Sequence, residues 1–327
     1  MSPRRAAARQ HTGGHWSPGD APALFLVMRV SDDICDELAR GGHHAWWLTP
    51  ANDHPDERGV ERLGRALDAG CRTLLDSGVF SLASAHARAR SMELPDVLQL
   101  PPDHLDGYDE LRRQYVRLVK TYEPRLWGYI EHDLGGREVK RRNRAALEAE
   151  GLRPIPVWHP FSDGAAYFDE LAERYDRICV GNFVFAPPAV RVRLLHWLWE
   201  RRRRYPGVWI HALGVAPWPA LFGVPCDSVD TSSWESLFRR GSGTERALLH
   251  PAGDTQAFAP TLGADAGAPN GHQRALKLAG AAAVAWQRAW TRWHNEQVEL
   301  LGITQPPRMR TASSTLRAGV APGHSQG

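Results

Sequence analysis

The chain has few cysteines, and none lies at the spacing of a metal site. Its 327 residues contain Cys35, Cys71, Cys179 and Cys226, and no two of them form a CxxC or CxC pair. Each lies in or beside an apolar run, which is typical of a buried thiol. We therefore expect reduced, buried cysteines, no zinc site, and no metal or cofactor.

Long apolar runs are also missing. No stretch of about 18 apolar residues occurs, so no membrane span is expected. The N-terminus, residues 1–5, is positively charged, but the apolar segment of a secretory signal does not follow it. The sequence thus predicts a cytoplasmic protein. Its formal net charge of +3 permits a nucleic-acid partner without requiring one.

The two ends of the chain lack a hydrophobic period. Residues 1–22 and 305–327 are rich in Ala, Arg, Gly and Pro, which predicts a disordered basic arm and a disordered tail. Either end could reach a phosphate backbone, although a solvated tail is the simpler interpretation. The length suits one α/β barrel with additions.

Between the two ends, short apolar runs alternate with helical patterns. We expect eight strands, at 24–30, 45–48, 72–75, 126–130, 153–158, 177–181, 208–213 and 228–231. We expect helices at 57–69, 105–122, 137–150, 164–175, 189–204 and 217–222. This alternation favours parallel strands, and eight of them close a (β/α)8 TIM-like barrel over residues 23–240. An open doubly wound sheet is the alternative, but no glycine fingerprint follows the first strand.

A C-terminal extension should follow the barrel at residues 241–304. It begins as a loop and continues as one long helix over 273–301. Trp286, Trp290 and Trp293 share one face of that helix, and we expect the face to pack on the barrel. Stacking on nucleic acid is the alternative.

Polar residues gather where the expected strands end. In a parallel barrel these ends meet at one face, where the active site forms. A single Asp after a strand is often only a helix N-cap, so the joint pattern carries the prediction. The candidates are Asp76, Ser77, Gly78, Glu131, Asp133, His159, Gly181, Asn182, His211, Gly214, Asp227 and Asp230. Carboxylates and histidines without a metal motif suit acid/base work or covalent catalysis.

Asp227 and Asp230 are the two candidates for a covalent nucleophile. Carboxylate nucleophiles are typical of reactions at the anomeric carbon of a sugar. In an extended segment, their odd spacing places the two side chains on opposite faces, so only one can point into the barrel mouth.

The order of these short motifs resembles the tRNA-guanine transglycosylase superfamily, and more closely its divergent, phage-associated branch of 7-deazaguanine DNA transglycosylases. Residues 75–81, LDSGVFS, resemble the family's Asp-Ser-Gly-Gly-Phe-Gln element. Residues 129–133, 154–160, 180–183 and 211–215 resemble further elements, in the same order. The run SVDTSSW at 228–234 is similar to a run of the divergent branch.

The resemblance implies a base-exchange glycosyltransferase that replaces guanine with a 7-deazaguanine such as preQ0. It assigns Asp230 as the nucleophile, with Asp227 as the alternative, and Asp76 as the general acid/base. It assigns Asp133 to the purine edge, since a carboxylate accepts N–H donors well. The other implied substrate-binding residues are Ser77, Gly78, Glu131, His159, Gly181, Asn182, His211, Gly214 and Trp234. The target nucleotide would have to flip out of its helix.

Two departures from the family bear on the substrate. The family's zinc motif is absent, and Val79 stands where the family has a second glycine. The absent zinc motif and the run at 228–234 favour DNA rather than tRNA as the partner. Two other classes of function stay open. A nucleosidase or glycosidase would use the same carboxylates with water as acceptor, and a non-catalytic barrel would only bind nucleic acid. The arginine run 201–204 is interpreted either as a phosphate contact or as a solvated helix end.

Overall fold

The computed structural model describes residues 9–17, 23–27, 46–215, 226–232, 290–292, 294–296 and 299. Eight strands of this part lie in one sheet, and every paired neighbour is parallel. The strands are β1 Ala23–Val27, β2 Trp46–Pro50, β3 Arg72–Asp76, β4 Gly128–Tyr129, β5 Val157–Trp158, β6 Arg177–Val180, β7 Trp209–Ala212 and β8 Ser228–Thr231.

The sheet closes into a barrel. The strand order is β4-β3-β2-β1-β8-β7-β6-β5, so the first and last strands are neighbours. The outer strands β4 and β5 are joined by a parallel bridge between Ile130 and Ile155. The Ile155 N–H donates to the Tyr129 carbonyl at 2.8 Å, and the Glu131 N–H donates to the Ile155 carbonyl at 3.0 Å. The (β/α)8 TIM-like barrel predicted from the sequence is confirmed.

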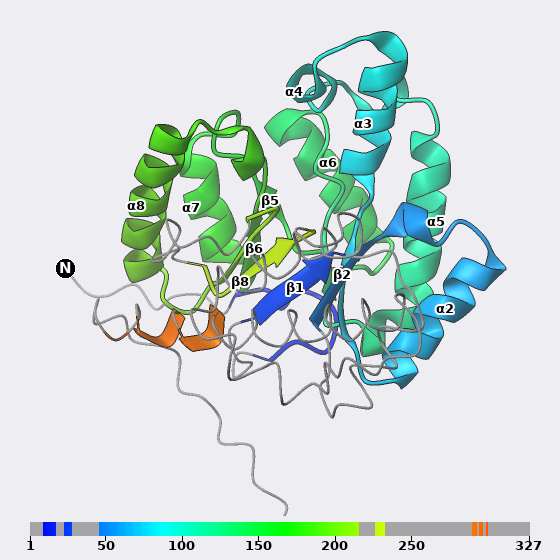
Figure 1. Cartoon of the computed structure of the whole chain (residues 1–327), viewed down its shortest axis with the longest axis horizontal. Helices are drawn as coiled ribbons and strands as arrows, with labels where there is room; N and C mark the ends of the chain where they lie inside the picture. The colour runs from blue at the N-terminus through cyan, green and yellow to red at the C-terminus, as the bar shows by residue number, and fades with distance from the viewer. Residues whose placement is uncertain are drawn as a thin grey trace, which may run out of the picture.

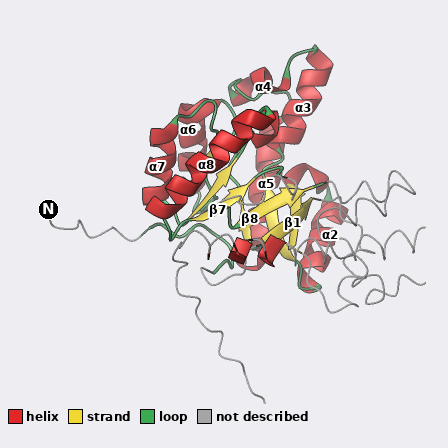
Figure 2. Ribbon diagram, turned by 60° about the vertical axis from the view of Figure 1, so that its left-hand side comes forward, coloured by secondary structure: helices red, strands yellow, loops and turns green. Residues whose placement is uncertain are grey.

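Helices cover the outside of the strands (Figure 1). They are α2 Glu57–Asp68, α3 Val79–Arg90, α4 Leu94–Val97, α5 Tyr108–Tyr122, α6 Gly136–Ala149, α7 Ala165–Arg174 and α8 Pro188–Arg204. Figure 2 shows the strands in yellow with α7 and α8 on one side and α2 on the other. Three helices, α3 to α5, connect β3 to β4. The sequence analysis predicted only α5 of these, and the helix expected at 217–222 lies outside the described residues.

Two apolar layers follow from the alternation of side chains along each strand. Phe25, Leu74, Trp127, Cys179 and Trp209 fill the barrel interior. A larger layer between strands and helices takes the alternate residues, such as Ile178 and Val180 of β6. The three cysteines in the described part, Cys71, Cys179 and Cys226, are free and buried, as predicted.

Aromatic rings occupy much of the interior. Trp127 lies 5.6 Å from Trp209 and 5.1 Å from Phe25, measured between ring centroids. Such edge and tilted pairs add to the burial of the ring area. No tryptophan in the part of the chain that the structure describes is exposed, and six of them are buried in the core: Trp16, Trp47, Trp127, Trp158, Trp209 and Trp290.

Residues 9–17, which we call the N-terminal strap, run across the barrel end from which the strands start. Gln10 forms a bridge with Tyr175 just before β6, and Thr12 is fully buried. Trp16 is only 6% exposed and packs in the interior layer. The expectation of a disordered arm over 1–22 is therefore wrong for these residues, because their few polar and aromatic groups match partners on the barrel floor.

Arg177, at the start of β6, fixes the strap. Its guanidinium donates to the carbonyls of Thr12 and Trp127 at 3.1 and 2.9 Å. It also lies 4.9 Å from the ring centroids of both Trp16 and Trp127. A buried arginine needs its donors satisfied, and here backbone carbonyls and π faces do so.

The described residues of the C-terminal extension are helical and contact Asp227, directly before β8. Trp290 is 5% exposed, and its indole N–H lies 3.4 Å from the Asp227 carbonyl. Trp286 and Trp293, expected on the same face, lie outside the described residues. No helix in the described ranges has the length and hydropathy to cross a bilayer.

Candidate active site

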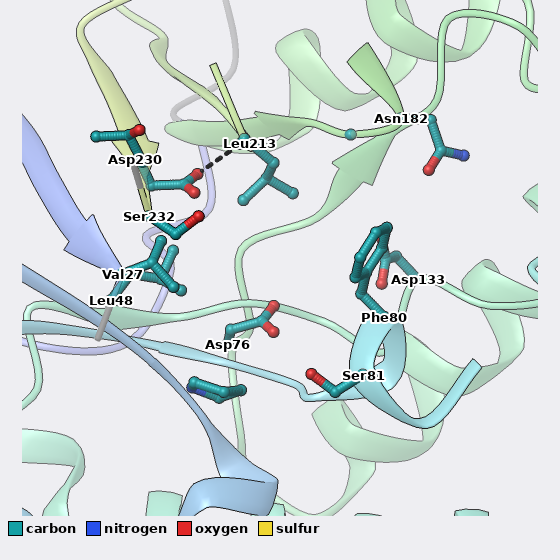
Figure 3. A pocket seen from close by; sticks show the side chains of 14 residues that line it. Val27, Leu48, Asp76, Phe80, Ser81, Asp133, Asn182, Leu213, Asp230 and Ser232 are labelled. Carbon is teal, nitrogen blue, oxygen red and sulfur yellow. Dashed lines mark hydrogen bonds between the residues drawn. The ribbon is translucent and has the colours of Figure 1, made fainter. Parts of the chain in front are cut away.

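A cavity of about 350 Å³ opens where the strands end, and three carboxylates reach it. Asp76 comes from β3, Asp133 follows β4, and Asp230 comes from β8. Figure 3 shows Asp76 and Asp230 pointing toward the same space. The lining residues are Val27, Leu48, Pro50, Asp76, Phe80, Ser81, Asp133, Gly181, Asn182, Leu213, Gly214, Asp230, Thr231 and Ser232. The sequence predicted six of these, and the three carboxylates were the central ones.

A tight turn after β3 holds Asp76. The Gly78 N–H donates to Asp76 Oδ2 at 3.1 Å, and the Val79 N–H donates to the Ser77 hydroxyl at 3.4 Å. Gly78 has φ +81°, a conformation that favours glycine. A Cβ there would lie 2.9 Å from the Asn52 side chain. Ser77 and Gly78 thus shape the turn, and neither lines the cavity.

The pKa of Asp76 is strongly raised from its ordinary value. Burial, and then the negative charges of Asp133 and Asp230, raise the pKa of Asp76 to about 7. Its two hydrogen bonds to backbone N–H groups oppose this shift only in part. A carboxyl with this pKa is present in both protonation states at neutral pH, which is what a general acid/base requires.

Asp133 is held in its ionised form. Burial raises its pKa, but the hydrogen bond and charge of His159 outweigh burial, and the pKa lies below its usual value. His159 Nε2 lies 3.0 Å from Asp133 Oδ2. The His159 ring also lies close to Gly181, where a Cβ would approach it to 2.7 Å. Glycine at 181 therefore allows the imidazole to reach Asp133.

A buried ion pair supports the His159 loop. Lys140 of α6 pairs with Asp163, and both side chains are fully buried. Asp163 Oδ2 also accepts the His159 backbone N–H at 2.6 Å. These contacts fix the backbone from which His159 reaches Asp133.

Glu131, predicted to bind substrate, does not reach the cavity. It is fully buried between the barrel and the helices, where Arg144 donates to it at 2.8 Å. Its other oxygen accepts the Val157 N–H at 2.6 Å. Glu131 and Asp133 are two residues apart, but β4 ends at Tyr129, before both of them, so the alternation of an extended strand does not place both in the cavity.

Asp230 is 6% exposed and is held through one oxygen. The Gly214 N–H donates to Oδ1 at 2.9 Å, drawn as the dashed line in Figure 3. His211 Nε2 lies 3.2 Å from the same oxygen. His211 is buried behind the carboxylate in the barrel interior and does not line the cavity.

Asp227, the alternative nucleophile, lies directly before β8, at the end of the strand away from the cavity. Its carboxylate pairs with Arg202 of α8 and accepts the Ile210 N–H at 2.8 Å. His294 approaches it to 3.5 Å. Burial would raise its pKa, but Arg202 prevails and lowers the pKa to about 2. Asp227 is thus a structural carboxylate, and its prediction as a catalytic residue is wrong.

The arginines of the run 201–204, at the end of α8, point in different directions and have different partners. Arg202 is 3% exposed and faces Asp227. Arg201 and Arg204 pair with Asp169 of α7 at 3.2 and 3.3 Å. The prediction of a solvated helix end is wrong for Arg202, because the helix turns this residue toward β8.

The sequence analysis missed the apolar wall of the cavity. Val27, Leu48, Pro50 and Leu213 form it, together with Phe80. Phe80 is 46% exposed, and its ring is stacked on that of Phe185 at 6.2 Å. Phe80 belongs to the LDSGVFS run, so that motif contained the signal. Apolar walls with a few convergent polar groups suit a planar organic ligand.

The remaining observations concern metal ligands and Trp234. Over the described ranges, no group of three or more His, Cys, Asp or Glu side chains could hold a metal ion. Trp234, the remaining predicted site residue, lies outside these ranges. The arrangement offers two ionised or ionisable carboxylates on facing strands and a third paired with histidine, which suits proton transfer and covalent catalysis.

Comparisons with known proteins add little. No protein-family model and no curated protein matches the chain. Among solved structures, the YdjI aldolase from Escherichia coli K12 is similar over 86% of this chain and 92% of that chain. The two are 9% identical, with a TM-score of 0.38. So weak a likeness carries no argument, and the barrel rests on the strand pairing described above.

Proposed function

We propose that this protein is an enzyme, a base-exchange glycosyltransferase that replaces guanine in DNA with a 7-deazaguanine such as preQ0. The observation that carries the proposal is the convergence of Asp76, Asp133 and Asp230 on one cavity. The resemblance of the sequence motifs to guanine transglycosylases gives each carboxylate its role. A cavity of about 350 Å³ with apolar walls is of a size to take one flipped base.

In the first step, an oxygen of Asp230 attacks C1′ of the target nucleotide. The C1′–O bond forms while the bond from C1′ to guanine N9 breaks, and the bonding electrons leave with guanine. Neutral Asp76 gives its proton to the departing base, as its raised pKa allows. The product is a covalent glycosyl-enzyme and an ionised Asp76.

In the second step, a 7-deazaguanine occupies the place of guanine. Asp76 takes the proton from its N9 as that nitrogen attacks C1′, and the Asp230 carboxylate leaves. Both carboxyls return to their starting states, so no co-reactant is needed. Water in place of the incoming base would give hydrolysis, which is the nucleosidase reaction.

Recognition of the base falls to Asp133. Its lowered pKa keeps it ionised at neutral pH, so it accepts N–H donors from the purine edge. Phe80, with nearly half its surface exposed, offers a face on which the base can stack. The preference for DNA over tRNA rests on the absent zinc motif and on the run 228–234.

The test is incorporation of labelled base. Purified protein is incubated with duplex DNA and labelled guanine or preQ0, with tRNA in a parallel reaction and Asp230→Asn beside it. Label in DNA that depends on Asp230 is the expected result. Label in tRNA alone would move the substrate to tRNA, and guanine release without incorporation would mark a hydrolase. If folded protein neither incorporates label nor releases guanine, the proposal is overturned.

A further inference from the structure

A chain of three hydrogen bonds runs through the barrel interior to Asp230. The Trp209 indole N–H donates to the Ser228 hydroxyl at 2.8 Å. Ser228 Oγ lies 2.8 Å from His211 Nδ1, and His211 Nε2 lies 3.2 Å from Asp230 Oδ1. Ser228 is fully buried, and His211 is 1% exposed. The base-exchange mechanism described above uses none of the first three residues.

The order of donors along this chain fixes the tautomer of His211. An indole N–H is only a donor, so Ser228 Oγ accepts from Trp209. The hydroxyl proton of Ser228 is then available, and His211 Nδ1 is the acceptor within reach. With its lone pair engaged at Nδ1, the neutral imidazole carries its proton on Nε2 and donates it to Asp230.

The two oxygens of Asp230 are consequently different. Oδ1 accepts from both His211 and the Gly214 N–H. Among the residues that the structure describes, none donates a hydrogen bond to Oδ2. One oxygen is therefore held by two donors, and the other has lone pairs that no donor among the described residues occupies.

We propose that His211 is a positioning residue for the nucleophile, oriented by Ser228 and Trp209, and that Oδ2 is the oxygen of Asp230 that attacks. The inference rests on the proposed function. Oδ2 forms the bond to C1′, and Oδ1 becomes the carbonyl oxygen of the ester. When the incoming base displaces Asp230, the C1′–Oδ2 bond breaks and its electron pair returns to the carboxylate. His211 and Gly214 stabilise the charge that then develops on Oδ1.

The first measurement needs no substrate. The ring nitrogens of His211 are observed by long-range 1H–15N NMR in full-length protein labelled at histidine, with His211→Gln to assign the signals. We expect a neutral ring protonated on Nε2 in the wild type, and loss of this single tautomer in Ser228→Ala. A wild-type ring protonated on Nδ1, or a ring that does not respond to Ser228→Ala, would overturn the inference.

The second measurement is the kinetics of base exchange. His211→Met removes the donor and should lower kcat by about 10²–10³-fold, the usual effect of losing one such donor, with little change in KM for the base. His211→Gln restores an N–H near the Nε2 position and should recover at least about tenfold of that loss. Equal losses in Met and Gln variants that remain folded would mean that the donor is not the cause, and would also overturn the inference.

Thr49→Val is the matched control. Thr49 Oγ1 lies 2.9 Å from His54 Nε2 in an equally buried hydroxyl–imidazole pair that does not contact the carboxylates. Its kcat should stay within about twofold of the wild type, because the site is separate. A loss of kcat in Thr49→Val equal to that in His211→Met would show a general packing effect and sink the inference.

Failure of the proposed function is distinguishable. An Nε2–H tautomer that depends on Ser228, in a wild-type protein that exchanges base on neither DNA nor tRNA, would leave the hydrogen-bond chain in place. It would nevertheless refute base exchange, and the positioning role in that reaction would fall with it.

Discussion

The two ends of β8 place the same kind of residue in opposite surroundings. Asp227, at the start of the strand, pairs with Arg202 and has its pKa lowered to about 2. Asp230, three residues later, shares a cavity with Asp76 and Asp133, and burial, followed by the negative charges of Asp133 and Asp230, raises the pKa of Asp76 to about 7. Where a cation compensates each carboxylate, the barrel is stabilised. Where carboxylates face one another and no lysine or arginine of the described residues pairs with them, the charge remains available for chemistry.

Substitution of Asp230 tests the chemical end of the strand. Asp230→Asn keeps the size and the hydrogen-bonding oxygen but lacks the nucleophilic charge, so base exchange should fall by about a thousandfold or more. The free energy of unfolding should not decrease, since one of three mutually repelling charges is removed. Label incorporation and chemical denaturation measure the two effects. Full activity in this variant would exclude Asp230 as the nucleophile.

Substitution of Asp227 should show the reverse. Asp227→Asn leaves Arg202 buried without its counter-charge, which costs about 3–5 kcal/mol of folding free energy. Protein that remains folded at low temperature should still form the covalent intermediate, because Asp227 lies outside the cavity. Urea unfolding and single-turnover assays of the two variants can be compared directly. Normal stability together with lost chemistry in Asp227→Asn would reverse our assignment of the two ends.

Burial of Asp76, together with charge repulsion at the open end, predicts a pH-dependent stability. The folded pKa of Asp76, about 7, exceeds its ordinary value of 3.8, so the folded protein binds this proton more tightly. Stability is lost as pH rises from about 4 to about 7, and the loss is complete above that window. Asp76→Asn should therefore be about 2–4 kcal/mol more stable than the wild type at pH 8 and nearly equal to it at pH 4.

Thermal or denaturant unfolding at the two pH values provides the measurement for Asp76. An equal difference at pH 4 and pH 8 would show that its charge is not the cause. The same titration should appear in catalysis. Glycosylation needs the neutral acid, so its rate should decline above about pH 7 in the wild type, and Asp76→Asn should lose most of its activity and this decline together.

The smallest expected effects come from substituting two aromatic residues, one at each end of the barrel. Phe80 at the mouth is 46% exposed, so Phe80→Ala should raise KM for the base by about three- to tenfold with little loss of stability. Trp16 at the floor is 6% exposed, so Trp16→Ala should cost about 3 kcal/mol of stability and leave KM unchanged. An unaltered KM in Phe80→Ala would remove stacking from the proposal.

Sequence reasoning predicted the parts of the fold that local patterns determine. The eight strands and the polar groups at their ends follow from short apolar runs and from the geometry of parallel strands. Asp76, Asp133 and Asp230 could be placed at one face for this reason. Helix α3, VFSLASAHARAR, was missed because small and polar residues blur its apolar stripe.

The missed features depend on partners that are distant in sequence. The pairing of Asp227 with Arg202 spans 25 residues, and nothing local marks Arg202 as the inward member of an arginine run. Glu131 and Asp133 look equivalent in sequence, yet Glu131 pairs with Arg144 and Asp133 pairs with His159. The N-terminal strap has too few apolar residues to signal burial, because its contacts come from polar groups and Trp16.

The strap also sets an order for synthesis of the protein. Its hydrogen bonds to Ala172, Arg174 and Asp176 join residues more than 160 positions apart, and Thr12 and Asp176 are separated by 164 positions. A ribosome adding about 5–20 residues per second needs roughly 8–33 s to make that intervening chain. During this interval, the residues against which the Trp16 indole packs have not yet been made. Trp16 is therefore exposed early in synthesis and is buried only after β6 has emerged. A chaperone can bind the growing chain during this delay.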